Sequence, residues 1–219
     1  MSLGKASEQK GTAVKKILES RIKKSLEALT FNLEEDYYFS DGLVQGRKLV
    51  IDQLVTFSGV RFVGAMFVLG PEAILEFVDC VFEKCDFSNL DLAGSKFYRC
   101  RFSSCKLLGA DFTNCYFQDV KILDCLLDFA NFSSSRMKAF LIQDSQVTEA
   151  LFEACKFENV QLFHNQLEAS NFWETDLSGL DFSSNEFERL EVSPELARNI
   201  KINLGQASFF AGLRGIEIV

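Results

Sequence analysis

The apolar positions of the chain recur with a period of five residues. Every fifth residue from Phe77 to Phe187 is apolar without a break, and 13 of these 23 positions are Phe. A helix repeats every 3.6 residues and a strand every two, so neither keeps every fifth side chain on one face. The strict period therefore predicts a solenoid, in which each short repeat buries its apolar side chain only by stacking on its neighbours.

A second column of residues lies two positions before the apolar series and is filled mainly by small side chains, such as Ser95. All seven cysteines fall in it: Cys80, Cys85, Cys100, Cys105, Cys115, Cys125 and Cys155. There is no C-x-x-C motif, and the one histidine, His164, lies outside the column, so a disulfide framework or a zinc site is disfavoured. The pattern favours reduced thiols that act as small buried hydrophobes. Phe140 is bulky for this column, and we expect local distortion between Met137 and Ile142.

The N-terminal part of the chain differs from the repeat. Residues 1–11 lack apolar periodicity and are predicted to be disordered. Over residues 12–29, apolar side chains at helical spacing alternate with Lys and Arg, which predicts an amphipathic helix. Its basic face is expected to contact solvent rather than a membrane or nucleic acid. Residues 33–56 are expected to form irregular strands, so that residues 12–56 provide a helix, a lead-in and a cap.

The repeat domain is predicted to span residues 57–192, with a first coil that begins at Phe57 and a loop around Pro71. Residues 193–219 are predicted to form a C-terminal cap and dimerisation segment. The elements expected there are a short helix starting at Ser193 and Pro194, a strand at residues 200–202, a short helix at residues 205–213 and a strand at residues 216–219.

Three stretches of the repeat carry a family resemblance. Residues 85–89, 90–94 and 110–114 each place Asp before the apolar residue and mostly polar or small residues after it. They resemble the pentapeptide-repeat family, whose members are right-handed quadrilateral β-helices with four repeats per coil. The resemblance implies an all-β solenoid with coils of 20 residues, so that residues 20 apart stack. Short N- and C-terminal helices complete the predicted fold.

The sequence offers little for catalysis. It has one His, no glycine-rich phosphate loop, no G-x-S-x-G motif and no metal-ligand spacing, so we expect no enzymatic activity, no metal and no cofactor. Aspartates such as Asp176 and Asp181 occupy the polar position of the repeat itself, which explains their recurrence. No signal peptide and no membrane-spanning apolar run are present, and a cytoplasmic protein is expected.

The outward charges are distributed unevenly among the four predicted faces. Two consecutive faces carry eleven acids and two bases, a net of −9, whereas the other two carry nine acids and eight bases, a net of −1. The eleven acids are Asp86, Asp91, Asp111, Asp128, Glu149, Glu153, Glu168, Glu174, Glu186, Glu188 and Glu191. An acidic stripe repels nucleic acid and attracts a basic groove. The alternative is a general contribution to solubility, which the overall formal charge of −8 would also fit.

A more specific resemblance follows from residues 77–89, residues 177–183 and the tail from Phe187 to Ile218. They resemble the quinolone-resistance branch of the family, and most closely its chromosomal Gram-positive members, which protect DNA gyrase and topoisomerase IV. The resemblance implies a DNA mimic, a dimeric acidic rod that lies in the DNA-binding saddle of a type II topoisomerase. Loops that interrupt the repeat in some members are absent between Phe77 and Phe187, which leaves protection and simple inhibition both open.

The end of the rod and its less acidic faces suggest further contacts. An open coil end presents unpaired backbone groups and must be covered, and in the family members the C-terminal segment pairs with its twofold mate. The residues expected at such a homodimer interface are Phe209, Phe210, Leu213, Ile216 and Ile218. The alternative function is a scaffold or regulatory module that binds a different protein. Its contact residues would be the outward apolar side chains Tyr98, Tyr116, Leu123, Leu141 and Phe163.

Overall fold

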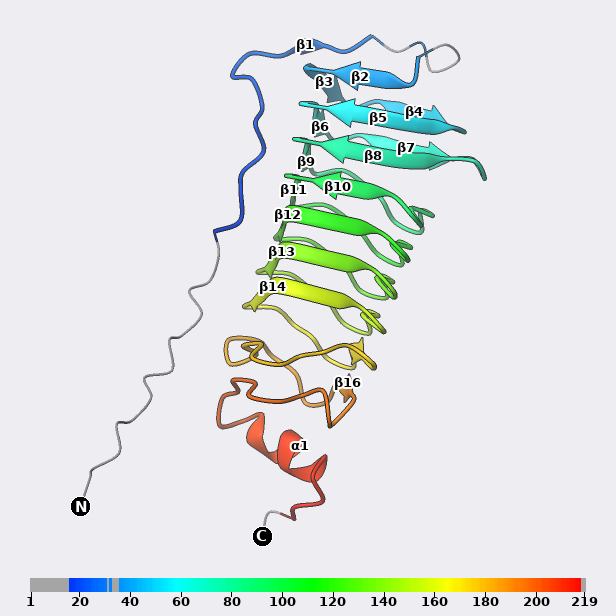
Figure 1. The fold of residues 1–219 in the computed structure, drawn as a ribbon. Coiled ribbons are helices and arrows are strands. Elements are labelled where there is room, and N and C mark those ends of the chain that lie inside the picture. The colour runs from blue at the N-terminus through cyan, green and yellow to red at the C-terminus, as the bar shows by residue number, and fades with distance from the viewer. Residues whose placement is uncertain (1–15, 31, 33–35, 218–219) are drawn as a thin grey trace, which may run out of the picture.

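The structure is a computed structural model that describes residues 16–30, 32 and 36–217 of the 219-residue chain. Residues 1–11, predicted to be disordered, lie outside the described residues. The described chain winds into a right-handed β-solenoid of about eight turns (Figure 1). The prediction of an all-β quadrilateral β-helix is therefore confirmed.

Short parallel strands make up most of the regular structure. The strands are β1 (Glu27–Ala28), β2 (Tyr38–Ser40), β3 (Gly42–Gln45), β4 (Lys48–Ile51), β5 (Leu54–Ser58), β6 (Arg61–Val63), β7 (Met66–Leu69), β8 (Ile74–Val78), β9 (Val81–Glu83), β10 (Lys96–Tyr98), β11 (Arg101–Ser103), β12 (Tyr116–Leu123), β13 (Arg136–Gln143), β14 (Lys156–Phe163), β15 (Asn171–Phe172) and β16 (Glu191–Val192). Among the described residues the one helix is α1 (Ala207–Gly212). It lies within the helix predicted at residues 205–213, which is confirmed.

The pairing register establishes the coil length. Phe77 in β8 pairs with Phe97 in β10, which pairs with Phe117 in β12, and every step is 20 residues. The predicted stacking of residues 20 apart is confirmed. At the N-terminal end, β2, β3 and β4 form a regular coil that stacks on β5, β6 and β7 with an offset of 18, as in Phe39 opposite Phe57. Residues 38–51 are therefore a full coil rather than the irregular lead-in expected from the sequence.

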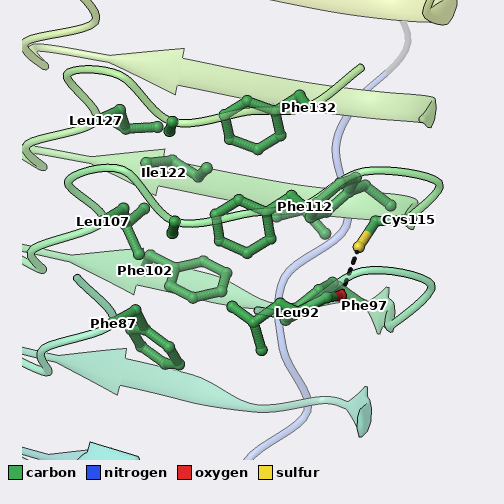
Figure 2. Packing of buried hydrophobic residues seen from close by; sticks show 14 of the residues in the cluster. Phe87, Leu92, Phe97, Phe102, Leu107, Phe112, Cys115, Ile122, Leu127 and Phe132 are labelled. Carbon is green, nitrogen blue, oxygen red and sulfur yellow. Dashed lines mark hydrogen bonds between the residues drawn. The ribbon is translucent and has the colours of Figure 1, made fainter. Parts of the chain in front are cut away.

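The interior is filled by ladders of stacked phenylalanine rings. In one ladder, the centroids of Phe112 and Phe132 are 4.9 Å apart (Figure 2). Those of Phe132 and Phe152 are 5.0 Å apart. Neighbouring faces meet edge to face, as Phe112 and Phe117 do at 5.9 Å. Burying each Phe contributes about 1.5–3 kcal/mol. Because every ring packs against the coils on both sides, no single repeat could obtain this burial alone.

Each corner of the coil depends on a residue in the left-handed backbone region. From Asp79 to Gly179, the second residue after every core position has a φ between +51° and +79°. Left-handed φ costs an L-residue roughly 1–2 kcal/mol, and Gly, Asn and Asp tolerate it best. The chain nevertheless places residues such as Phe129 and Ala139 there, because the stacked coils above and below fix the turn.

The column of small residues has a role beyond its size. The seven cysteines are free thiols and are buried, as predicted. In addition, the Sγ–H groups of Cys80, Cys100, Cys105, Cys115 and Cys155 donate to the backbone carbonyl 23 residues earlier, and Cys115 does so to the Leu92 carbonyl at 3.1 Å (Figure 2). Ser135 donates to the Phe112 carbonyl in the same way at 2.7 Å. Small donors are therefore favoured here because they satisfy interior carbonyls of the preceding coil.

Phe140 does not distort the coil, and that expectation is wrong. β13 is continuous from Arg136 to Gln143, and Phe140 stacks in register between Val120 and Val160. Its side chain is fully buried, with its ring 5.2 Å from that of Phe117. Its neighbours in the stack, Val120 and Val160, are also apolar, and the ring packs inside the coil without breaking the register.

The prediction of an N-terminal helix is also wrong for the described residues 16–29, which are extended and run along the outside of the rod (Figure 1). Their polar groups bind the rod instead of each other: the Leu18 N–H donates to Asp119 Oδ1 and the Arg21 N–H to Asp79 Oδ1, both at 3.0 Å. Ile17 is buried, but Leu18 is half exposed. Tertiary hydrogen bonds have overridden the helical pattern.

The start of the C-terminal segment also differs from the prediction. Pro194 follows Ser193 into a turn closed by the Leu196 N–H and the Ser193 carbonyl at 3.0 Å, and no helix forms there. Lys201 makes an isolated bridge to Asp181 in place of a strand. Residues 216–217 are not in a strand, and the two residues after them lie outside the described part.

Candidate partner-binding surface

The eleven predicted acids lie on the two faces of the rod that lack long strands. These faces are joined coil to coil by isolated bridges, such as Asp86 to Lys106 and Asp91 to Asp111. We call these two faces the acidic side, and the two faces built on β8 to β14 the strand side. None of the eleven side chains is buried. The half-buried ones are Asp86, Asp111, Asp128, Glu153 and Glu168, and the exposed ones are Asp91, Glu149, Glu174, Glu186, Glu188 and Glu191.

Some of these acids have a structural task. Asp86, Asp91 and Asp111 each accept the backbone N–H of the residue two positions later, at 3.0, 3.0 and 2.8 Å. Hydrogen bonds from Ser88 are the main cause that lowers the pKa of Asp86, burial opposes them, and Lys106 lowers it further. The positions of Asp86, Asp91 and Asp111 are therefore explained by the turns that their side chains close.

Two further acids accept hydrogen bonds from backbone N–H groups of the next coil. Asp128 accepts the N–H of Thr148 at 2.9 Å, and Glu168 accepts the N–H of Glu188 at 2.6 Å. Glu168 also lies 3.5 Å from the guanidinium of Arg189. These contacts bridge coils through charged acceptors, which makes the carboxylates part of the scaffold as well as of its surface.

The remaining six acids are concentrated at one end of the acidic side. They are Glu149, Glu153, Glu174, Glu186, Glu188 and Glu191, and in the described part of the chain their carboxylates accept no hydrogen bond and form no ion pair. All lie in the last three coils of the repeat. The charge count predicted an acidic stripe but not which of its acids have partners, and the structure places the carboxylates without intramolecular partners beside the C-terminal end.

One large aromatic residue lies among these acids. Trp173 is 46% exposed and occupies the outward position directly after Phe172. The coil before it presents Glu153 at the same position, and Glu174 is its neighbour along the chain. Tryptophan beside charged residues is a common anchor of protein interfaces. The acidic side therefore combines charge with one apolar contact point.

On the strand side, by contrast, basic side chains lie one coil away from acidic side chains and pair with them. Arg99 donates two hydrogen bonds to Asp79, at 2.7 and 2.8 Å. Burial alone would raise the pKa of Asp79, but the hydrogen bonds from Arg99 and Arg21 outweigh it and the pKa is lowered. Other pairs follow the same 20-residue step: Lys96 with Glu76, Lys138 with Glu158 and Lys201 with Asp181. Arg101 pairs with Glu83, 18 residues earlier.

The apolar residues of the alternative scaffold hypothesis all lie on the strand side. Tyr98 and Tyr116 contact each other with ring centroids 5.4 Å apart, and Leu123 is half-buried. Leu141 and Phe163 line a groove of about 790 Å³ beside β14. Sequence reasoning identified both residues but gave no sign of the groove, because it depends on a break in stacking between two coils.

The residues predicted for a dimer interface cover the last coil. Phe209 and Phe210 pack on Phe187 with ring centroids 6.1 and 6.2 Å away. The Gln206 side-chain amide donates to the carbonyls of Phe182 and Asn185, at 3.1 and 2.8 Å, and so satisfies groups at the open end.

Other members of the predicted interface are less engaged. Leu213 is half-buried against the core, Ile216 is 59% exposed, and Ile218 lies outside the described residues. Leu204, next to the helix, is 92% exposed. The segment is therefore a cap of its own coil, and its role in a dimer stays a prediction.

Two further searches of the described residues found no site. No group of three or more His, Cys, Asp or Glu side chains in this part of the chain could hold a metal ion. No helix within the same residues is long and apolar enough to cross a membrane. His164 is exposed, as predicted, with Nδ1 3.4 Å from a carboxylate oxygen of Asp144.

The repeat was also compared with known proteins. Residues 75–152 match a family model described as a pentapeptide repeat region. This part of the chain is therefore similar to a pentapeptide repeat region, in agreement with the resemblance drawn from the sequence. The comparison with curated proteins gave no match.

Solved structures with a related shape include three named proteins. HetL, a pentapeptide repeat protein involved in heterocyst differentiation regulation from the cyanobacterium Nostoc, is 10% identical, with 75% of this chain and 86% of that chain covered and a TM-score of 0.48. A trypsin-treated form of QnrB1, a plasmid-mediated fluoroquinolone resistance protein, is 19% identical, with 83% and 99% covered and a TM-score of 0.37. Rfr23 from the cyanobacterium Cyanothece is 12% identical, with 78% and 95% covered and a TM-score of 0.22.

Proposed function

We propose that this protein is a non-catalytic acidic rod that binds a type II topoisomerase, DNA gyrase or topoisomerase IV, as a DNA mimic and so modulates quinolone susceptibility. The observation that carries the proposal is the set of six carboxylates without intramolecular partners on the acidic side, set against the paired charges of the strand side. The choice of partner is supported by the resemblance of residues 77–89 to the quinolone-resistance branch.

The physical basis is a fixed array of negative charge. Stacked coils hold successive carboxylates about 4.8 Å apart along the rod, which is sparser than the phosphates of duplex DNA at about one charge per 1.7 Å. A groove that binds DNA has basic side chains over the same length, so it would attract this side at long range. Association is then expected to be steered electrostatically and to weaken as salt rises.

Supercoiling by purified gyrase and decatenation by topoisomerase IV, each with and without a fluoroquinolone, test the proposal. The variant Glu153→Gln/Glu174→Gln/Glu191→Gln removes three of the six carboxylates. We expect it to raise the concentration needed for an effect about tenfold at low salt, since each exposed charge contributes roughly 0.5 kcal/mol.

The matched control removes three acids from the strand side, as Glu76→Gln/Asp124→Asn/Asp144→Asn. It has the same net charge as the test variant and should act like the unmodified protein. An equal effect of both triple variants would mean that net charge, not the acidic side, governs binding. No effect of the unmodified protein on either enzyme at micromolar concentration would remove the proposal.

A second candidate function is a repeat scaffold that binds a different protein through the strand side. The observation that favours it is the groove beside β14, where Leu141 and the 45% exposed Phe163 present apolar surface. Phe163→Glu should abolish binding to such a partner and leave topoisomerase inhibition or protection unchanged. The acidic-side triple variant should have the reverse effect.

We also propose a homodimer through the C-terminal segment, in the cytoplasm with its proposed partner. Ile216 is suited to a test because it is exposed and does not support the cap. Ile216→Lys should convert the dimer to a monomer in sedimentation equilibrium without changing the unfolding midpoint. A monomer before any substitution would contradict the proposal.

A further inference from the structure

The N-terminal segment, residues 16–29, and the strand side of the rod form a cavity between them. The segment runs along the outside of the rod (Figure 1). The Ser20 hydroxyl donates to the Arg99 carbonyl at 2.6 Å, and the Arg21 N–H donates to Asp79 at 3.0 Å. The cavity beside these contacts has a volume of about 370 Å³. Its walls are Glu19, Ser20, Ile22, Arg61, Val81 and Arg101. This volume is near the lower end of the range for small-molecule sites, so the cavity suits a small ligand.

Two arginines line this cavity because of the register of the coils. Arg61 in β6 and Arg101 in β11 both pair with Val81 in β9, one from each side. The two arginines are therefore two coils apart, about 10 Å along the rod. The side chain between them is short, which leaves space between the two cationic side chains.

The guanidinium of Arg101 lacks good hydrogen-bond partners. Arg61 donates from its Nη2 to both carboxylate oxygens of Glu83, at 2.9 and 2.8 Å. The Nη2 of Arg101 is 3.6 Å from the same carboxylate, which is too far for a hydrogen bond. The Nε of Arg101 is buried, and among the described residues it is the one buried side-chain nitrogen or oxygen without a partner. A buried donor of this kind destabilises the protein unless a water or an ion accepts its hydrogen bond.

The charge around the cavity is positive, unlike that of the whole chain. A second cavity, of about 440 Å³, shares Arg61 as a wall and is also lined by Lys23 and Lys24. The two cavities together are lined by these three bases and Arg101 and by only two acids, although the formal charge of the chain is −8. Both acids are already engaged in ion pairs. The lining therefore favours an anion.

Two guanidinium groups beside one small cavity are suited to a phosphate group. Arginine presents a rigid, permanently charged fork of N–H donors that matches phosphate oxygens. Arg61 uses its Nε and Nη2 on Glu83, so within the described residues its Nη1 remains available to a ligand. A phosphate has more oxygens than a carboxylate and can carry two negative charges, so it can accept from both Arg61 and Arg101 at once.

We propose that this cavity binds a phosphate group, as inorganic phosphate or as a small phosphate monoester, between Arg61 and Arg101. The bound group also holds the N-terminal segment on the rod, because residues of both line the cavity. The site lies on the strand side and does not depend on the partner proposed for the acidic side.

Calorimetric titration of the full chain at low ionic strength tests the site, with inorganic phosphate and glycerol phosphate as the two probes. We expect saturable binding of one phosphate group per chain. Arg101→Gln should raise the Kd at least about tenfold, because one of the two charged donors is lost. Arg136→Gln is the matched control. It removes the same charge from an exposed position of β13 that lines neither cavity, and it should leave the Kd nearly unchanged.

Amide hydrogen exchange of the unmodified protein provides a measurement that needs no substitution. At a phosphate concentration ten times the Kd, exchange in residues 17–22 should slow about tenfold, because the ligand binds only while the segment lies on the rod. Exchange in β13 should not change.

The two probes also identify the source of the phosphate group. Tighter binding of glycerol phosphate would assign the site to a small ester, and tighter binding of inorganic phosphate to the free ion. No saturable binding of either probe at millimolar concentration would overturn the proposal. Equal losses in Arg101→Gln and Arg136→Gln, or unchanged exchange in residues 17–22, would also overturn it. Tighter binding of malonate than of both probes would contradict it too, because the site would then be one for carboxylates.

Discussion

The acidic side and the strand side are built by the same repeat and stacked with the same 20-residue step, yet they treat charge in opposite ways. On the strand side the step places Arg99 on Asp79 and Lys138 near Glu158. On the acidic side it places Asp111 on Asp91. Like charges one coil apart repel, whereas opposite charges attract. The difference shows that stacking determines which side chains lie next to each other in neighbouring coils. The order of charged residues along the chain then determines whether those neighbours attract or repel each other.

The two sides also differ in what covers them. The strand side carries the extended N-terminal segment, which covers Val81 and Asp119 so that both are buried although they occupy outward positions. The described residues place no comparable segment over the acidic side. Carboxylates that lack partners there repel one another, which lowers the stability of the folded chain.

The largest expected effect concerns the interior that both sides share. Phe132→Ala removes a ring stacked between Phe112 and Phe152 at 4.9 and 5.0 Å. It should lower the free energy of unfolding by about 3–5 kcal/mol in urea denaturation. Phe129→Ala, at a 59% exposed position three residues earlier, is the matched control and should change it far less. Equal losses in the two variants would show that the ladder is not the main source of stability.

The buried thiols of the interior predict that the protein loses stability at alkaline pH. Burial is the main cause that raises the pKa of Cys115 to about 12 and that of Cys155 to about 12, from the reference value of 9.0. Because the folded protein favours the protonated thiol, this stability is complete below pH 9 and is lost as the pH rises toward 12. The free energy of unfolding should therefore fall steeply over that range.

Substitution of the thiols separates this effect from other alkaline titrations. Cys115→Ser/Cys155→Ser retains a small donor at both positions but has no group that ionises near pH 9, so its decline between pH 9 and 12 should be shallower. A parallel decline in the variant and the unmodified protein would assign the effect to Lys and Tyr instead.

The charge comparison itself is tested by removing one acid from each side. Asp79→Ala takes away the acceptor of two Arg99 hydrogen bonds and of the Arg21 N–H, and should cost about 1–3 kcal/mol. Glu191→Ala, on the acidic side, should change the free energy of unfolding by less than about 0.5 kcal/mol. If the two losses were the same, pairing on the strand side would contribute nothing measurable.

The smallest expected effect is a gain on the acidic side. Glu188→Gln relieves repulsion with Glu168, whose carboxylate holds the Glu188 backbone N–H at 2.6 Å. It should raise the free energy of unfolding by up to about 0.5 kcal/mol at low salt and by nothing at 1 M salt, where charges are screened beyond about 3 Å. Glu76→Gln, which loses its contact with Lys96, should show a small loss under the same low-salt conditions.

The fold could be predicted from the sequence because its signal is local and repeated. The apolar residue at every fifth position and the small residue two before it specify the inside of each face, and most members of both columns are buried as expected, with Phe157, Phe187, Leu90 and Val160 half-buried. The acids were also placed correctly on two adjacent faces. Which of them have partners could not be predicted, because Asp128 and Glu168 bind backbone groups one coil away whose direction depends on the turn.

The ends of the chain were harder to predict than the repeat. The apolar spacing of residues 12–29 fits a helix, but the described residues 16–29 are extended because Asp79 and Asp119, about 60 and 100 residues away, accept their N–H groups. The groove beside β14 likewise could not be predicted, because it arises where the segment at residues 176–184 forms no strand paired with β14. Local periodicity indicates neither feature, because both depend on residues that are far apart in the sequence.

The sequence by itself determined the solenoid, its 20-residue coil and the faces on which the charges lie, since a strict repeat allows only one way to bury its phenylalanines. Only the tertiary structure decided the path of residues 16–30, the break in stacking after β14 and the pairing state of each carboxylate. The reason is that these features depend on differences of one or two hydrogen bonds between competing distant contacts, whereas the core depends on many equivalent contacts that all favour the same register.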